Sequence, residues 1–420
     1  MNRIILDKVA CSAHRIDYTY HAEGECQRFF HPDQTFFIEY SADVTGVPES
    51  MAAIPFVCNV LPIAWVVDAE LVVPELDASF AAHIDEIKQG YVDMYPRMTF
   101  GGHVTAGKLV ENDTPPSEKT AAFFSSGVDA YTTLIRHYDE HPTLVTLYGS
   151  DVKLEDTEGW ALVKGNVTQA AKEFACDTLF IRSSFRMFLD EGALSAFVQE
   201  RAGDGWWHGF QHGIGLIGHI APYAWKEKLK TMYIASSFTA KDKGHVTCAS
   251  DPTIDNHVHM GTCHTIHDGY ELTRQDKVAQ ICSFHKERKL PIHLHVCWVS
   301  EGGDNCCVCE KCCRTIYAII AEGENPKDYG FRYDDATFHN IERRIRVELL
   351  LDAVGIVYWQ DIQARFRQHP DRATGPLAWI LTADFLKENT GTERKRKLRR
   401  QRFTHLKGRI ASKVRHLLGN

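Results

Sequence analysis

Short apolar runs alternate with helix-length segments along the middle of the chain. Each run has about the length of a strand, and its apolar residues follow one another rather than alternating with polar ones. Strands of a parallel sheet that are buried on both faces have this character, and helices usually connect them. We therefore predict an α/β domain in which helices cover both faces of a parallel sheet. The predicted strands begin at Thr120, Leu144, Asp177, Thr231 and His293.

The two flanking regions have different patterns. Residues 36–40 (FFIEY) and the apolar run over 54–73 predict strands, and apolar residues recur at helical spacing from Phe80 to Met94. The segment ENDTPPSEK at 111–119 is unsuited to a helix or a central strand. Residues beyond 331 are mostly helical in pattern. We predict an N-terminal α+β domain over 1–115, a central domain over 116–330 and a helical C-terminal region over 331–420.

Composition and charge narrow the class of protein. The 420 residues are 44% hydrophobic and 24% charged, with no export signal and no apolar run of membrane-spanning length, so we expect a folded cytoplasmic protein. The net charge of -8 conceals a basic C-terminal tail, residues 394–415, with eleven Lys or Arg and no acid. Its apolar residues predict a basic amphipathic helix for an acidic partner, an anionic membrane or nucleic acid. A homo-oligomer is also compatible with this sequence.

The first predicted strand ends in the sequence SSGVDA. A tight turn into a helix at this point presents backbone N–H groups at the positive end of the helix dipole, which suits phosphate binding. Gly127 permits close approach of an anion, the two serines supply hydroxyls, and Asp129 suits either a cap or a Mg²⁺ ligand. The predicted nucleotide-binding residues of this turn are Ser125, Ser126, Gly127, Val128, Asp129 and Ala130.

Six of the 13 cysteines lie between Cys297 and Cys313. Such density without an export signal favours metal binding over disulfides. Two C-x-x-C spacings suit a tetrahedral Zn²⁺ site, an iron–sulfur cluster is the competing interpretation, and Cys307 and Cys313 offer alternative registers. The predicted metal ligands are Cys297, Cys306, Cys309 and Cys312.

The turn and the cysteine cluster together resemble a known family. The turn is similar to the SGGxDS signature of the PP-loop ATP pyrophosphatases, with Ser126 in place of the first glycine and Ala130 in place of the last serine. The C-x8-C-x2-C-x2-C cluster that follows resembles the 7-cyano-7-deazaguanine synthase branch. The resemblance covers about residues 120–322. It implies a Rossmann-like, HUP-type sheet, ATP with Mg²⁺, cleavage of ATP to AMP and pyrophosphate, and a structural zinc.

Other candidate residues follow the later strands. In open α/β sheets, ligands bind beyond the carboxyl ends of strands, so we add Tyr148 and Gly149 to the nucleotide site. We predict that Arg182 and Arg186 pair with an anion and that His212, between flexible glycines such as Gly213 and Gly215, contacts a phosphate or a carboxylate. Ser236, Ser237 and Thr239 are candidate substrate contacts, and the alternative is that they only end a strand.

Residues 250–274 form a polar segment rich in acid–base groups. We interpret it as a substrate-binding loop rather than a second metal site, because its spacing matches no zinc pattern. Its candidate residues are Asp251, Asp255, His257, His259, His264, His267, Asp268 and Arg274. Ser125, Asp129, His212 and Arg274 are the predicted catalytic residues.

The predicted function is ATP-dependent adenylation of a carboxylate, followed by attack of an amine to form an amide or nitrile. The carboxylate belongs to a small molecule, or to a protein or peptide. One alternative is adenylation-coupled sulfur transfer to a nucleobase, which needs a reactive thiol among Cys248, Cys263 and Cys307. The other is a scaffold protein that binds ATP without cleaving it.

Overall fold

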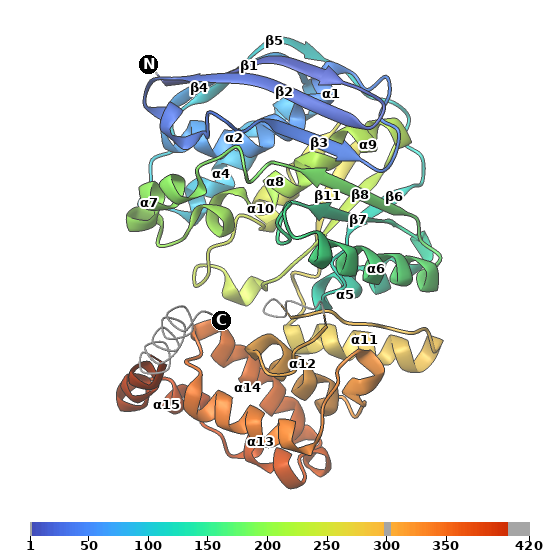
Figure 1. Cartoon of the computed structure of the whole chain (residues 1–420), viewed down its shortest axis with the longest axis vertical. Coiled ribbons are helices and arrows are strands. Elements are labelled where there is room, and N and C mark those ends of the chain that lie inside the picture. Colours follow the sequence, from blue (N-terminus) through green and yellow to red (C-terminus); the bar gives the residue numbers. More distant parts are fainter. Residues whose placement is uncertain (1, 298–303, 402–420) are drawn as a thin grey trace, which may run out of the picture. The chain divides into compact units, whose positions relative to one another are not determined.

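The computed structural model describes residues 2–297 and 304–401, which form two compact units, Met1–Glu271 and Leu272–Asn420 (Figure 1). Neither predicted domain boundary, at 115 or at 330, separates these units. The predicted basic helix begins at Arg394, and its residues from 402 onward lie outside the described residues. Within its described part, Lys397 is buried and its ammonium group donates to the carbonyl oxygen of Ile345 at 2.8 Å, so this lysine is not a solvated charge of an amphipathic helix.

One large mixed sheet organises the first unit. In the described part of the chain it has eleven strands in the order β10-β11-β9-β6-β7-β8-β3-β2-β1-β4-β5. Strands β11, β9, β6, β7 and β8 run parallel, β8-β3-β2-β1 are joined by antiparallel pairings, and β1-β4-β5 are again parallel. The bounds are β1 Asn2–Cys11, β2 Arg15–Glu23, β3 Phe36–Tyr40, β4 Ala69–Asp77, β5 His103–Val110, β6 Thr120–Phe123, β7 Thr143–Tyr148, β8 Thr178–Ser183, β9 Thr231–Ala235, β10 His259–Met260 and β11 Cys263–Asp268.

The N-terminal region is part of this sheet rather than a separate domain. Strand β3 pairs with β8, and buried side chains of both regions, such as Ile4, Phe36, Val145 and Met232, belong to one hydrophobic core. A polar segment at 111–119 does connect β5 to β6. The two sets of strands nevertheless cannot be separated without exposing their shared core, which is why the polar connection does not mark a boundary.

Four of the five predicted parallel strands are present, as β6, β7, β8 and β9. The fifth prediction is wrong: residues 293–297 are not a strand, and β11 takes the fifth place in the parallel set. Strand β11 lies inside the segment predicted to be a substrate-binding loop. Its residues alternate, with Cys263, Thr265 and His267 buried and His264 and Ile266 exposed, as expected for a strand with one buried face.

Residues 54–66 are a helix, not a strand. All 13 residues of α2 are buried, including Pro62, so the segment is apolar on every side. A run of this kind lacks a helical stripe and cannot be distinguished from buried strands by periodicity. The helices of the first unit are α1 Glu49–Ala52, α2 Ile54–Val66, α3 Ala78–Ala82, α4 Ile84–Met94, α5 Val128–Arg136, α6 Thr157–Phe174, α7 Glu191–Ala202, α8 Ile214–Ile217, α9 Ala221–Glu227 and α10 Pro252–Asp255.

The second unit is helical. Buried aromatic side chains pack around Tyr317, whose hydroxyl accepts a hydrogen bond from the indole of Trp379 at 2.9 Å. The main helices are α11 Arg274–Arg288, α12 Glu310–Ala321, α13 Asp335–Arg343, α14 Ala353–Gln368 and α15 Phe385–Glu388. Among the helices of both described ranges, none combines the length and the apolar character needed to cross a bilayer.

Candidate functional sites

The order of the parallel strands places the β6–α5 turn at a distinctive point of the sheet. Strands β7 and β8 follow β6 on one side, whereas β9 and β11 lie on its other side. The chain therefore runs from β6 to β7 on one side and later returns to β9 on the other side of β6. A crevice is expected beyond the carboxyl ends of the strands at such a point. Residues 125–130 follow β6 directly, so the predicted phosphate-binding turn lies where this topology favours a ligand.

Ser126 is the unusual residue of this turn. Its φ of +60° is left-handed, a conformation that costs most residues about 1–2 kcal/mol and is normally taken by glycine. Its side chain is 1% exposed, and Oγ has no hydrogen-bond partner among the described residues. Ser125 is exposed and Gly127 is the N-cap of α5, with φ of -78° and ψ of 171°. The turn thus combines a strained backbone with an unsatisfied hydroxyl at a helix N-terminus.

Asp129 and Asp268 have different roles around α5. Asp129 lies half-buried in the first turn of the helix. Asp268, at the end of β11, is buried and accepts hydrogen bonds from Thr133 Oγ1 at 2.8 Å and Arg136 Nε at 3.1 Å. Burial opposes ionisation of Asp268, but these bonds and His137 outweigh burial and lower its pKa. Asp268 therefore joins β11 to α5 and positions the helix behind the turn.

His137 should make stability depend on pH. It lies 3.3 Å from Asp268 and 2.9 Å from Glu140; burial opposes its protonation, but these partners outweigh burial and raise its pKa. The stability it contributes is fully present below its unfolded pKa of about 6.5 and is lost as pH rises through the raised folded pKa. We expect the difference in unfolding free energy between wild type and His137→Gln to shrink from about pH 6 to pH 9 in urea titrations. A difference that grows with pH would contradict this assignment.

Tyr148 and Gly149 shape the turn after β7. The Tyr148 hydroxyl donates to the Leu154 carbonyl oxygen at 2.7 Å, and its ring stacks on Trp160 with 4.5 Å between centroids. Gly149 has φ of +105°, and an added Cβ would lie 2.0 Å from the carbonyl oxygen of Ser183. The Tyr148 hydroxyl is therefore already used within the loop after β7, and Gly149 lets that loop pass close to the end of β8.

Substitution of Gly149 should destabilise the first unit. Gly149→Ala adds a Cβ to a left-handed position against a backbone oxygen, for which we expect a loss of about 2–5 kcal/mol of unfolding free energy. Gly165→Ala is the control, because Gly165 lies in α6 with no atom within 4 Å of an added Cβ. It should gain about 0.5–1 kcal/mol. Equal effects of the two substitutions in denaturant titrations would refute this interpretation.

The predicted anion contacts at the end of β8 and the predicted substrate contacts after β9 have partners inside the protein. Arg182 donates to Glu39 at 2.9 Å, and Arg186 forms a bidentate pair with Glu191. Thr239 caps a short 3₁₀ helix, η5 (Ala240–Asp242), and the Ser236 N–H donates to the Asp268 carbonyl oxygen at 2.8 Å. Ser237 lies in the same segment. The contacts of Thr239 and of the Ser236 backbone therefore fit the alternative prediction, in which these residues only end the strand.

The histidines and acids of residues 250–268 mostly contact one another. Asp255 is fully buried, with one carboxylate oxygen 2.7 Å from Ser250 Oγ and 2.8 Å from His267 Nδ1; burial raises its pKa. Asp251 caps α10. The ring of His259 lies between those of His83 and His264. His257 is half-buried beside this group.

Arg274 begins α11 in the second unit, where its guanidinium lies 5.5 Å from the centre of the Tyr358 ring.

His212 lies beside Cys248. Its Nδ1 is 3.8 Å from the thiol sulfur, and it follows a π-helical turn, η3 (Trp207–Gln211), that also carries His208. Burial alone would raise the pKa of Cys248, but hydrogen bonds from His208 and His212 outweigh burial and lower it to about 6. His208 Nδ1 lies 2.8 Å from Asp204. Sequence reasoning identified Cys248 and His212 separately but missed His208 and Asp204; the H-x3-H spacing in WHGFQH was the available signal.

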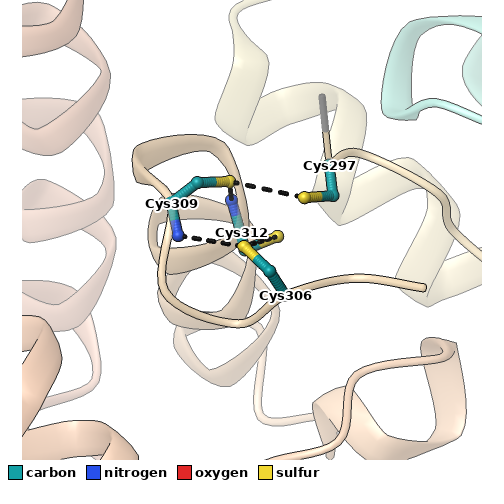
Figure 2. Close-up of side chains that lie close together, drawn as sticks. All are labelled: Cys297, Cys306, Cys309 and Cys312. Atoms are coloured by element: carbon teal, nitrogen blue, oxygen red, sulfur yellow. Dashed lines mark hydrogen bonds between the residues drawn. The ribbon is translucent and has the colours of Figure 1, made fainter. Parts of the chain in front are cut away.

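The four predicted cysteine ligands lie together in the second unit (Figure 2). Their sulfur atoms are all within 4.8 Å of one another, with 3.9 Å between Cys309 and Cys297 and between Cys306 and Cys312. Four sulfurs on a tetrahedral Zn²⁺ with Zn–S of about 2.3 Å would be about 3.8 Å apart. The cluster can therefore hold a metal ion. No second group of three or more suitable side chains lies close enough among residues 2–297 and 304–401.

Hydrogen bonds from the backbone and from neighbouring side chains hold the cysteines of the cluster in place. The N–H of Cys309 donates to Cys306 Sγ at 3.2 Å, and Cys309 caps α12 by accepting from the N–H of Cys312. Asn305 bonds the carbonyl oxygen of Leu294 at 2.7 Å and the N–H of Val296 at 3.0 Å, which holds the segment before Cys297 against the loop. The alternative registers are not used: Cys307 donates to the carbonyl oxygen of Asn305, and Cys313 is buried outside the group.

Comparison of the chain with protein-family models, curated proteins and solved structures finds no significant match.

Proposed function

We propose that this protein is an ATP-dependent adenylating enzyme with a Rossmann-like, HUP-type core, which converts ATP to AMP and pyrophosphate and activates a substrate carboxylate for carbon–nitrogen bond formation. The observation that carries the proposal is Ser126, whose buried hydroxyl lacks a partner in a left-handed turn at the N-terminus of α5. Buried polar groups are normally satisfied, so an unsatisfied hydroxyl beside helical N–H groups supports a binding site for an anion at this turn.

The proposed roles follow from the chemistry of the turn. The N–H groups at the start of α5 and the hydroxyls of Ser125 and Ser126 would contact the phosphates, and the carboxylate of Asp129 would hold Mg²⁺. Gly127, Val128 and Ala130 supply backbone groups. Donors that contact the departing pyrophosphate stabilise the charge that develops on it. Zn²⁺ in the four-thiolate cluster would be structural, since four thiolates leave no open position for water.

The reaction products test this proposal. Purified protein incubated with α-labelled ATP, Mg²⁺ and candidate carboxylates, including deazapurine acids, should release labelled AMP and pyrophosphate. Release that depends on one carboxylate would also identify the substrate class. Labelled ADP would instead indicate a kinase-like reaction and refute adenylation, whereas binding of ATP with neither product would support the scaffold alternative.

Sulfur transfer is a second candidate function, favoured by one specific observation. Of the three thiols that could serve it, Cys248 alone has its pKa lowered, to about 6. Burial raises the pKa of Cys263 to about 12 and also raises that of Cys307. Sulfur transfer would require Cys248 together with a sulfur donor. Formation of a thiolated nucleobase only when a sulfur donor is supplied would establish this function in place of carbon–nitrogen bond formation.

A further inference from the structure

We propose that Cys248 is a nucleophile that receives the activated acyl group from AMP as a thioester before an amine takes it. This inference rests on the proposed adenylation for the origin of the acyl group. The arrangement of the thiol, its two neighbouring histidines and the carboxylate of Asp204 is seen in the structure and does not depend on ATP binding.

The geometry resembles that of a reactive thiolate beside two histidines, one of which is held by a carboxylate. The sulfur of Cys248 lies 3.8 Å from His212 Nδ1, and His208 approaches the same thiol. Asp204 holds His208 at 2.8 Å and accepts a second hydrogen bond, also 2.8 Å, from Thr247. The backbone N–H of Ala249 donates to the carbonyl oxygen of His208 at 2.9 Å, which keeps residue 248 beside the π-helical turn. Such turns occur frequently at functional sites.

The cluster lies among loops that follow strands on both sides of β6. The ring of His212 contacts Trp207, and the guanidinium of Arg186 lies over Trp207 at 4.2 Å. Arg186 also donates to the carbonyl oxygen of Ser150, just after β7. On the other side of β6, the ring of His208 contacts Phe238, three residues after β9. Cys248 is therefore held near the loops that flank the proposed nucleotide turn.

The charges of the neighbouring histidines favour ionisation of the Cys248 thiol. The lowered pKa of Cys248 leaves most of the thiol ionised at neutral pH, and the pKa of His208 is raised to about 10, first by Asp204 and then by Cys248. The other titratable groups around the pair are Tyr91, Tyr95, Asp151 and Asp255. The phenols of Tyr91 and Tyr95 are neutral because burial raises the pKa of both. Burial opposes protonation of His212, but Cys248, with smaller contributions from Asp151 and Asp255, outweighs burial and raises its pKa.

The proposed step balances without another reactant. The thiolate attacks the carbonyl carbon of the acyl adenylate, the bond from that carbon to the AMP oxygen breaks, and AMP leaves with the electron pair. An amine then attacks the thioester carbon, the carbon–sulfur bond breaks so that the thiolate leaves with the electron pair, and the proton released from nitrogen passes to solvent. A persulfide at the same cysteine would need a sulfur donor that the proposed adenylation does not supply, which is why we infer a thioester.

An ATP-free acyl donor tests the thiol separately from adenylation. We expect p-nitrophenyl acetate to release about one equivalent of p-nitrophenolate in a burst and to leave one hydroxylamine-labile acetyl group on the peptide containing Cys248. Cys248→Ser should abolish the burst and the label. His212→Gln and Asp204→Asn should slow acylation about tenfold or more at neutral pH by lowering the thiolate fraction. Circular dichroism would verify that each variant is folded.

Alkylation supplies a second measurement and an internal control. The rate at which iodoacetamide modifies Cys248 should rise through a midpoint near pH 6, and His212→Gln should move that midpoint upward. Exposed Cys11, whose pKa is raised, should react only in more alkaline solution. A midpoint at Cys248 like that of Cys11, or acetylation of Cys11 without acetylation of Cys248, would overturn the proposal. If Cys248 is acylated but ATP yields no AMP, adenylation fails and the nucleophile remains.

Discussion

Replacing Cys309 with serine is expected to abolish metal binding and to unfold the second unit. Its thiol forms part of the four-sulfur group and also caps α12. A serine hydroxyl can keep the cap, so the substitution removes one metal ligand without removing the helix cap. Structural Zn²⁺ contributes about 10–16 kcal/mol in small zinc-binding peptides, and a whole domain is stable by only about 5–15 kcal/mol. Native mass spectrometry should show one metal ion per chain in the wild type and none in Cys309→Ser, and proteolysis should cleave the second unit rapidly.

A neighbouring cysteine provides the matched control for this substitution. Cys307 is buried in the same loop but lies outside the group, and it donates to the carbonyl oxygen of Asn305. A serine can keep that hydrogen bond, so Cys307→Ser should retain the metal and the protease resistance. Loss of metal from both variants, or from neither, would contradict the ligand assignment. Visible absorption by the purified protein would identify an iron–sulfur cluster in place of colourless zinc.

Ser126→Ala should stabilise the free protein and impair its reaction with ATP. A buried hydroxyl without a partner costs about 1–3 kcal/mol, so its removal should raise the unfolding free energy by up to about that amount. A hydrogen bond from the same hydroxyl to a charged phosphate is worth about 1.5–3 kcal/mol, so AMP formation should fall about 10- to 150-fold in kcat/KM. Opposite changes in stability and activity are typical of a residue held ready for a ligand.

The Ser126→Gly substitution distinguishes the effect of the hydroxyl from the effect of the backbone conformation. It also removes Oγ, but it relieves the left-handed strain at φ of +60°, so it should be about 1 kcal/mol more stable than Ser126→Ala. Both variants should lose activity to a similar degree if the hydroxyl contacts phosphate. Full activity in both would refute a phosphate contact at Ser126, and a loss of stability in Ser126→Ala would indicate that the hydroxyl has a structural partner.

Local sequence patterns predicted much of the parallel sheet and failed where burial depends on distant residues. Strands β6 to β9 follow from apolar runs bounded by turn residues. The run over 54–66 was misinterpreted because α2 is apolar on all sides and its partners, such as β4, are set by the fold. Strand β11 was missed because its buried face carries Cys263, Thr265 and His267, whose polar character matches a loop until the neighbouring β9 is known.

The chain's own sequence determined the β6–α5 turn and the set of four cysteines, because both depend on spacing within a short segment. Only the tertiary structure decided that the N-terminal strands continue the same sheet, that Arg182 and Arg186 pair with Glu39 and Glu191, and that Cys248 meets His212 and His208, the latter held by Asp204. Apart from Arg186 with Glu191 and His208 with Asp204, which lie five and four positions apart, those contacts join residues that are distant along the chain. These residues approach one another because the elements that carry them pack on a common core, and a local sequence pattern cannot predict that packing.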